Sequence, residues 1–168
     1  MVGGLAVSAR AEPRFTRDVD LAVAVDDDAH AERLVRSLQS AGYLPLEVIE
    51  QEATGRLATV RLQPPGGDEH GVVLDLLFAS SGIEPELVAR ATSLEVFPEL
   101  ALPVARLSDL IAVNVLARDD EERPQDAADL CALKARAADS DLVEARRALE
   151  LISGYHRNRG LRARLEGS

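Results

Sequence analysis

The sequence Asp-Val-Asp-Leu-Ala-Val-Ala-Val at residues 18–25 decides how this chain folds and where its chemistry lies. Asp18, Asp20 and two alanines alternate with aliphatic side chains, a period of two that predicts a β-strand with one apolar face. The two carboxylates then lie on the same face, with Cα atoms roughly 6.5–7 Å apart. Because neighbouring carboxylates repel each other unless a positive charge lies between them, we expect a divalent cation at the start of this strand.

The composition indicates a sizeable apolar core and a strong negative charge. Of the 168 residues, 46 % are hydrophobic and 29 % are charged, which fits one domain or a compact core with a helical appendage. A net charge of −10 weighs against broad, sequence-independent binding of nucleic acids, because such binding relies on Lys and Arg. A local basic patch remains compatible with that charge, and the residues from His156 onward are rich in arginine.

Cysteine content and hydropathy predict a cytoplasmic protein. Cys131 has no second cysteine to pair with, which excludes an intrachain disulfide and fits a reducing compartment. We interpret Cys131 as a small buried residue of a helix rather than a nucleophile. No apolar run reaches the ~18 residues that a membrane-spanning helix needs, so we expect no membrane partner.

A second strand carries a third carboxylate. Six of the seven residues at 72–78 are apolar, which predicts a central strand buried on both faces, and Asp75 lies in its middle. An unpaired carboxylate there would cost several kcal/mol, so Asp75 needs a partner. A buried arginine is one explanation. A metal site shared with Asp18 and Asp20 is the other, and it accounts for all three acids together.

The remaining pattern predicts an α+β protein, a mixed sheet flanked by helices with a helical C-terminal portion. Strands dominate the first part of the chain and helices the last, and we expect a core at 1–105 with helices at 106–168 packed on it as one unit. Further strands are expected at 43–50 and 56–62, short extended pieces at 94–97 and 102–105, and helices at 29–41, 84–91, 108–118 (with Ser108 as cap), 124–138, 140–152 and 154–165.

Two glycines near the N-terminus are candidates for contact with a phosphate. Gly3-Gly4 precedes residues 5–10, which suit a short helix, and the backbone N–H groups at such a helix start bind anions. A flexible chain end is the alternative interpretation.

Taken together, these segments resemble the nucleotidyltransferase superfamily with the DNA polymerase beta-type palm. Gly-Gly-Leu-Ala-Val from Gly3 and Arg-Phe-Thr-Arg-Asp-Val-Asp-Leu from Arg14 are similar to the AbiEii-type nucleotidyltransferases, many of which are toxins of bacterial toxin–antitoxin or phage-defence pairs. Arg-Pro-Gln-Asp-Ala-Ala-Asp-Leu from Arg123 matches a helical segment of the same group. The resemblance covers roughly residues 2–135. Its four matching pieces are the two glycines, the acid pair at Asp18 and Asp20, Asp75 on the later strand and this helical segment, and their correct order makes it specific.

The resemblance implies transfer of a nucleoside monophosphate from an NTP to a hydroxyl, assisted by Mg²⁺ or Mn²⁺. Asp18 and Asp20 would bind both ions, and Asp75 would bind the second and act as, or beside, the general base. Arg14 or Arg17 would neutralise developing phosphate charge, with a solvated arginine as the alternative. The implied acceptor is an RNA or tRNA end, a protein or a small molecule, and the implied protein partner is an antitoxin. The residues expected to contact the nucleotide are Gly3, Gly4, Ser8, Thr16, Arg17 and Asn114.

Two departures from the family pattern motivate an alternative function. Asn114 stands where the family usually has a lysine, and an amide brings no positive charge to a triphosphate, although Arg118 lies one helical turn further along. Relatives also carry a helix and a strand before the two glycines; without them we expect an exposed sheet edge that a homodimer would cover. The alternative is a catalytically weakened palm that binds a nucleotide or a partner protein.

A last pair of acids lies on one helix face. We interpret Asp126 and Asp129 as first-turn acids that complement the helix dipole and pair with Arg123, with a further metal pair as the alternative.

Overall fold

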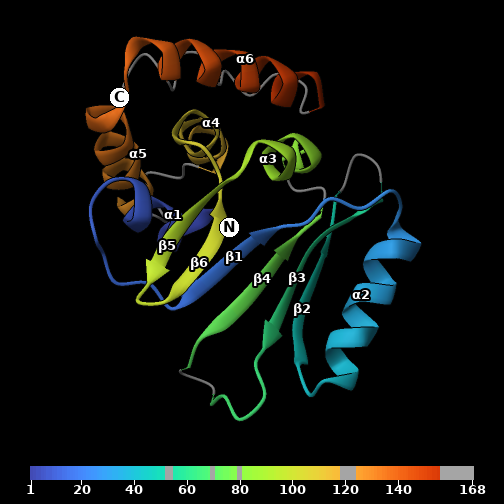
Figure 1. Cartoon of the computed structure of the whole chain (residues 1–168). Coiled ribbons are helices and arrows are strands. Elements are labelled where there is room, and N and C mark those ends of the chain that lie inside the picture. Colours follow the sequence, from blue (N-terminus) through green and yellow to red (C-terminus); the bar gives the residue numbers. More distant parts are fainter. Residues whose placement is uncertain (52–54, 69–70, 79–80, 118–123, 156–168) are drawn as a thin grey trace.

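In a computed structural model, described for residues 1–51, 55–68, 71–78, 81–117 and 124–155, the chain forms two sheets and six helices (Figure 1). The larger sheet has the strand order β1 (Asp18–Ala22), β4 (Val73–Leu77), β3 (Leu57–Gln63) and β2 (Leu44–Glu50). β1 runs parallel to β4, whereas the other pairs are antiparallel. A hairpin of β5 (Thr92–Phe97) and β6 (Leu100–Val104) forms the second sheet. The predicted α+β class is confirmed.

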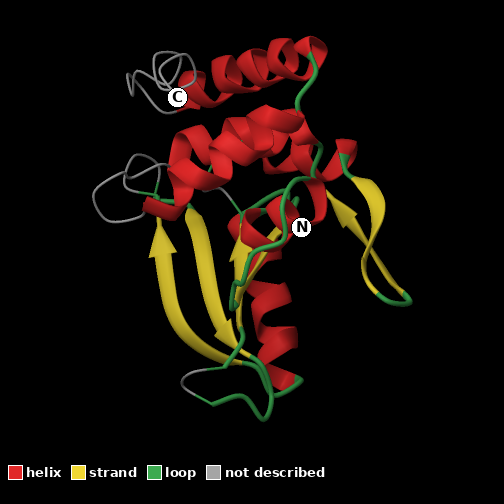
Figure 2. Cartoon of the chain, turned by 90° about the vertical axis from the view of Figure 1, so that its left-hand side faces the viewer, coloured by secondary structure: helices red, strands yellow, loops and turns green. Residues whose placement is uncertain are grey.

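The helices cover the large sheet unevenly. They are α1 (Gly3–Arg10), α2 (Asp28–Ser40), α3 (Glu84–Arg90), α4 (Leu107–Ala117), α5 (Pro124–Arg136) and α6 (Asp139–Tyr155). Figure 2 shows α2 running alongside the strands while α4 to α6 stack beyond one end of the sheet. None of the helices in these described ranges is long and apolar enough to cross a membrane.

Alternation along the central strands separates an apolar face from a charged one. Val60 pairs with Leu76 and Leu62 with Leu74, and these side chains form one cluster with α2. The residues between them, Arg61 and Asp75, must therefore point to the opposite face. The strand predicted at 72–78 is central, because β4 lies between β1 and β3, but it is not buried throughout: within β4 only Asp75 and Leu76 are buried.

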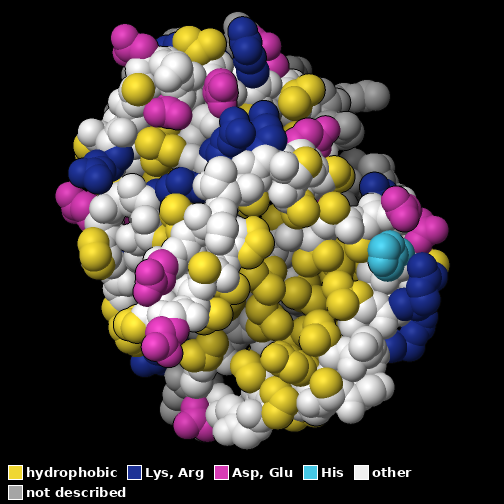
Figure 3. Space-filling view, viewed as in Figure 1, with side chains coloured by type: hydrophobic (Ala, Val, Ile, Leu, Met, Phe, Trp, Pro, Cys, Tyr) yellow, Lys and Arg dark blue, Asp and Glu magenta, His cyan; other side chains and the backbone are white. Residues whose placement is uncertain are grey.

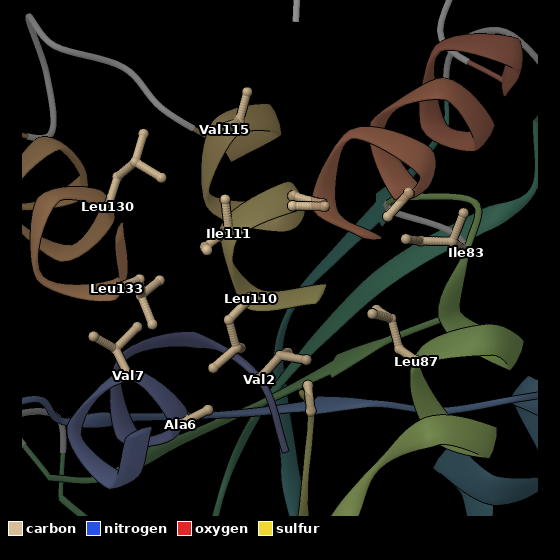
Figure 4. Packing of buried hydrophobic residues seen from close by; sticks show 14 of the residues in the cluster. Val2, Ala6, Val7, Ile83, Leu87, Leu110, Ile111, Val115, Leu130 and Leu133 are labelled. Atoms are coloured by element: carbon tan, nitrogen blue, oxygen red, sulfur yellow. The ribbon is translucent and has the colours of Figure 1, made fainter. Parts of the chain in front are cut away.

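The main core joins the N-terminal helix to the C-terminal ones. Val7 of α1 packs with Leu110 and Ile111 of α4 and with Leu133 of α5, each at most 1 % exposed (Figure 4). This single cluster includes residues from both portions predicted from the sequence. The C-terminal helices therefore hold α1, and with it the glycines at its start, in position.

Some sequence predictions need correction. Cys131 is exposed on α5, because Leu130 and Leu133 face the core and the position after Leu130 turns away from it. Ser108 lies inside α4, which begins at Leu107, and is buried near Glu144. The two helices expected after residue 139 are one continuous α6 as far as Tyr155, and the remainder of the second predicted helix lies outside the described residues.

The strand β2 leaves an edge of the large sheet open. All seven of its residues are exposed, and the apolar side chains among them are Leu44, Leu46, Val48 and Ile49. The homodimer predicted from the sequence remains a prediction, and β2 is one exposed edge that a second copy would cover.

The shared core yields a stability prediction. Replacing the fully buried Leu110 by Ala should lower the free energy of unfolding by about 2–5 kcal/mol, because it removes packed methyl groups and leaves a cavity. Leu151→Ala, on the exposed side of α6, should cost far less. Urea unfolding followed by circular dichroism measures both, and equal losses would contradict the described core.

A candidate active site of three carboxylates

Strand register places four charged side chains in one row across the large sheet. Asp20 of β1 pairs with Asp75 of β4, Asp75 with Arg61 of β3, and Arg61 with Glu47 of β2. Asp18 lies two residues before Asp20 and shares its face. The fold therefore brings the three predicted carboxylates to the same side of the sheet, away from α2.

Asp75 has an arginine partner. The Arg61 Nε and Nη2 atoms donate to its two carboxylate oxygens at 2.9 and 2.8 Å, and Asp75 is only 5 % exposed. This hydrogen bonding, followed by the nearby negative charges, raises the pKa of Arg61 above its already high ordinary value despite partial burial. A second carboxylate, that of Glu47, lies 4.0 Å from Arg61 Nη1. Of the two explanations for Asp75, the arginine is the contact that the structure shows.

Asp20 carries the electrostatic strain of the site. Burial, followed by the negative charges of Asp75 and Asp18, raises its pKa to about 6, although the nearby Arg61 and Arg14 act in the opposite direction. At neutral pH the ionised Asp20 is therefore held at a cost that a bound cation would relieve.

The start of α1 lies directly against this carboxylate. Gly3 has a φ of +65°, and a β-carbon there would overlap the Asp20 side chain. A β-carbon at Gly4 would meet the guanidinium of Arg14. The two glycines thus let a helix N-terminus, with its unpaired N–H groups, approach both a carboxylate and an arginine.

Arg14 connects the site to the C-terminal helices. Its Nη2 donates to Oδ2 of Asp129 on α5 at 2.7 Å, and Asp129 is 5 % exposed. The interpretation that Asp129 pairs with Arg123 is therefore corrected, and Arg123 lies outside the described residues. Ser8 holds the same loop, because its hydroxyl oxygen accepts from the Arg14 N–H at 3.2 Å and lies 3.0 Å from the Gly4 carbonyl oxygen.

The other residues expected to contact the nucleotide form local contacts. The Thr16 hydroxyl oxygen accepts from the Asp18 N–H at 3.4 Å, and the Asn114 amide donates to the Leu110 carbonyl of its own helix at 2.9 Å. Arg17 lies over the ring of Phe15, 6.0 Å from its centroid. Phe15 is 82 % exposed and lies three residues before Asp18 in the sequence. Arg118, considered as a substitute for the family lysine, lies outside the described residues.

Three carboxylates are suitable ligands for a divalent metal ion, but in this structure they are not close enough together to coordinate one. Oxygen donors of this kind bind hard divalent cations, and burial together with the charges of Asp75 and Asp18 raises the pKa of Asp20. Among the described residues, however, no three acidic, His or Cys side chains are gathered closely enough to hold an ion. The chemistry of these oxygen donors fits Mg²⁺ or Mn²⁺, and Asp75 would have to leave Arg61 in order to join such a site.

The comparison with known families identifies the protein class. The model described as "Nucleotidyl transferase AbiEii toxin, Type IV TA system" matches residues 1–167. The chain belongs to this family. The resemblance that the sequence motifs carried is thereby confirmed, and the AbiEii nucleotidyltransferase toxins of type IV toxin–antitoxin systems are its relatives.

A solved structure is also similar to this AbiEii-family chain. It is the crystal structure of an antigenic nucleotidyltransferase-like protein from Paracoccidioides brasiliensis, with 19 % sequence identity and a TM-score of 0.48. The match covers 98 % of this chain and 82 % of the other. No curated protein matches the chain.

The strain at Asp20 predicts a pH-dependent stability. Because the folded pKa of about 6 exceeds the ordinary value of 3.8, the folded chain retains a proton that the unfolded chain releases, so stability falls as pH rises from about 4 to about 6. Asp20→Asn should therefore stabilise the metal-free protein at pH 7.5 by about 1–3 kcal/mol, and the gain should vanish near pH 4. Urea unfolding at both pH values measures this; a gain that is independent of pH would contradict it.

Proposed function

We propose that this AbiEii-family chain transfers a nucleoside monophosphate from an NTP to a hydroxyl group and releases pyrophosphate, with Asp18, Asp20 and Asp75 as its catalytic carboxylates. The observation that carries the proposal is the strand register, which sets Asp20 beside Asp75 on one face with the start of α1 against Asp20. This arrangement supplies oxygen ligands for a cation and backbone N–H groups for a phosphate within one site.

In this proposal the carboxylates hold Mg²⁺ or Mn²⁺, which when bound would neutralise phosphate charge and lower the pKa of the attacking hydroxyl. Asp18 and Asp20 supply the first ligands, and Asp75 orients the acceptor hydroxyl and receives its proton, directly or beside another base. The N–H groups of Gly3 and Gly4 bind the triphosphate tail at the N-terminus of α1. Arg14, fixed by Asp129 beside Gly4, adds the positive charge that Asn114 does not bring.

The contacts support different roles, within this proposal, for three further residues expected to contact the nucleotide. Ser8 positions Arg14 and the start of α1, since its hydroxyl is engaged with both. Thr16 supports the backbone of Asp18. Arg17, together with the exposed ring of Phe15, presents a flat cationic surface to a nucleotide base.

The biological role follows from the family, whose members are toxins of type IV toxin–antitoxin systems. We propose that the chain modifies a cellular acceptor and that a cognate antitoxin opposes the effect. The acceptor classes to be distinguished are an RNA or tRNA end, a protein and a small molecule.

A screen for label transfer tests the proposal. The protein is incubated with each α-labelled NTP, Mg²⁺ and, separately, total RNA, cell protein and a set of hydroxyl-rich small molecules. We expect one acceptor class to gain label, with at least a hundredfold loss in Asp75→Asn, since removing a catalytic carboxylate typically costs ~10²-fold or more. Glu32→Gln, on α2 behind the sheet, should retain activity. If no combination of nucleotide and acceptor class shows label transfer that depends on Asp75, the proposal is contradicted.

The alternative function, a catalytically weakened palm that binds a nucleotide or a partner, is favoured by one contact. Arg61 occupies both oxygens of Asp75, so the third carboxylate is committed to an ion pair. The catalytic function requires a bound metal and nucleotide to displace Arg61 from Asp75, whereas the alternative function does not.

Substitutions at the ends of this ion pair test that displacement. Arg61→Gln removes the competitor for Asp75 and should lower the Mg²⁺ concentration needed for half-maximal activity, by roughly two- to fivefold for a partly exposed pair of up to about 1 kcal/mol. Glu47→Gln removes the neighbouring carboxylate to which Arg61 would move, and should raise that concentration. Mg²⁺ titrations of the labelled transfer measure both. Shifts in the same direction would rule out exchange of Arg61 between the two acids.

A further inference from the structure

The row of charged side chains across the large sheet has two different ends. At the β1 end, the start of α1 lies against Asp20 and Arg14 lies beside Gly4, so the groups proposed to bind the triphosphate gather there. At the other end, β3 and β2 continue the sheet beyond Asp75. In nucleotidyl transfer the attacking oxygen and the leaving pyrophosphate lie roughly in line, on opposite sides of the phosphorus. The acceptor therefore approaches over β3 and β2, an inference that rests on the proposed function.

Strand register defines the surface that such an acceptor meets. Arg61 and Asp75 share one face of the sheet, and the β3 residues two positions before and after Arg61 lie on the same face. The β2 partners of these three β3 residues complete the surface, which we call the acceptor-side surface. Its six residues are Thr59, Arg61 and Gln63 of β3 and Ile49, Glu47 and Leu44 of β2.

The outer part of the acceptor-side surface is apolar and open. Leu44 is 60 % exposed and Ile49 is 46 % exposed, and Glu47 lies between them along β2. With Leu46 and Val48, β2 carries more exposed large apolar side chains than any other helix or strand in the described part of the chain. Exposed apolar side chains that are grouped in this way are typical of a surface that binds a partner.

The charges on the acceptor-side surface are poorly suited to a polyanion such as RNA. Arg61 is the one cation among the six residues, and it is bonded to Asp75, with Glu47 4.0 Å away. Once Asp75 leaves Arg61, Glu47 remains as the partner of that guanidinium. An RNA strand needs several free Lys or Arg side chains along its phosphates. On the face seen in Figure 1, too, basic side chains form separate groups with acidic ones beside them, around an apolar centre (Figure 3).

We propose that the acceptor hydroxyl belongs to a polypeptide, on a Ser, Thr or Tyr side chain flanked by apolar residues that pack on Leu44 and Ile49. Adjacent strands lie about 4.8 Å apart, so a segment over β3 brings its hydroxyl within about one strand spacing of Asp75. The hydroxyl oxygen attacks the α-phosphorus of the NTP, the bond from that phosphorus to the bridging oxygen of the β-phosphate breaks, and pyrophosphate leaves. The hydroxyl proton passes to Asp75, and the product is a phosphodiester that joins the side chain to the nucleoside.

Peptides of defined chemistry test the acceptor class. The full chain is incubated with labelled NTPs, Mg²⁺ and one of three probes. The probes are ten-residue peptides with a central Ser, Thr or Tyr flanked by Leu, Val and Ala, matched peptides flanked by Asp and Glu, and total RNA. We expect label that is lost in Asp75→Asn to enter the apolar peptides, with at least tenfold less in the acidic peptides and none in RNA, since burying unpaired charge on an apolar surface is costly.

The outcomes separate this inference from the proposed function. Label in RNA or in a small molecule, but in neither peptide set, would overturn the inference and leave the proposed transferase intact. Equal labelling of the two peptide sets would also overturn it. An absence of label in every acceptor would contradict the transferase itself, and the inference with it.

Two substitutions on opposite faces of β2 test the binding surface. Ile49→Glu places a charge on the acceptor-side surface, whereas Val48→Glu is the matched control on the face toward α2, since Val48 pairs with Val60. Both side chains are exposed, so both variants should fold. Ile49→Glu should raise the KM for the apolar peptides at least tenfold, with kcat and the KM for the NTP changed less than twofold, and Val48→Glu should change none of these.

An unchanged peptide KM in Ile49→Glu, or an equal increase in Val48→Glu, would overturn the proposal. If Ile49→Glu leaves the KM unchanged and instead dissociates a dimer in sedimentation measurements, the surface binds a second copy, and the proposal is overturned in favour of that interface.

Discussion

The pairing of Asp20 with Asp75 is the constraint on which the rest of the site depends. Parallel strands set the two carboxylates side by side, and burial together with the charges of Asp75 and Asp18 raises the pKa of Asp20 to about 6. The protein offsets this repulsion in two ways, with Arg61 bonded to Asp75 and Arg14 near Asp20. An arrangement that is unfavourable without a cation is typical of a site built to receive one.

Packing connects the Asp20–Asp75 pair to the rest of the fold through α1. The start of α1 has room against Asp20 only because residue 3 is glycine, and α1 in turn is buried against α4 and α5. Arg14 bonds to Asp129 of α5, so the helical C-terminal portion fixes one of the positive charges beside the carboxylates. The helices that follow the sheet therefore contribute contacts to the candidate site.

The alternation of apolar residues predicted the strands and the carboxylates on them. The contacts that were not predicted join residues far apart in the sequence. The alternation at 18–25 and the apolar run at 72–78 predicted two strands and placed three carboxylates on them. Arg61 belonged to a predicted strand, but its bond to Asp75 depends on strand register, which that strand's own pattern does not specify. Asp129 lies 115 positions from Arg14, and its buried partner could not be inferred from spacing along α5.

Mn²⁺ binding measured by electron paramagnetic resonance tests the central claim most directly, since the signal of free Mn²⁺ disappears when the ion is bound. At pH 7.5 the wild-type chain should remove Mn²⁺ from solution in proportion to protein, and added Mg²⁺ should release it. Asp20→Asn should leave most of the Mn²⁺ free, because it removes the carboxylate whose charge is least compensated. Equal Mn²⁺ uptake by the wild type and Asp20→Asn would contradict the account.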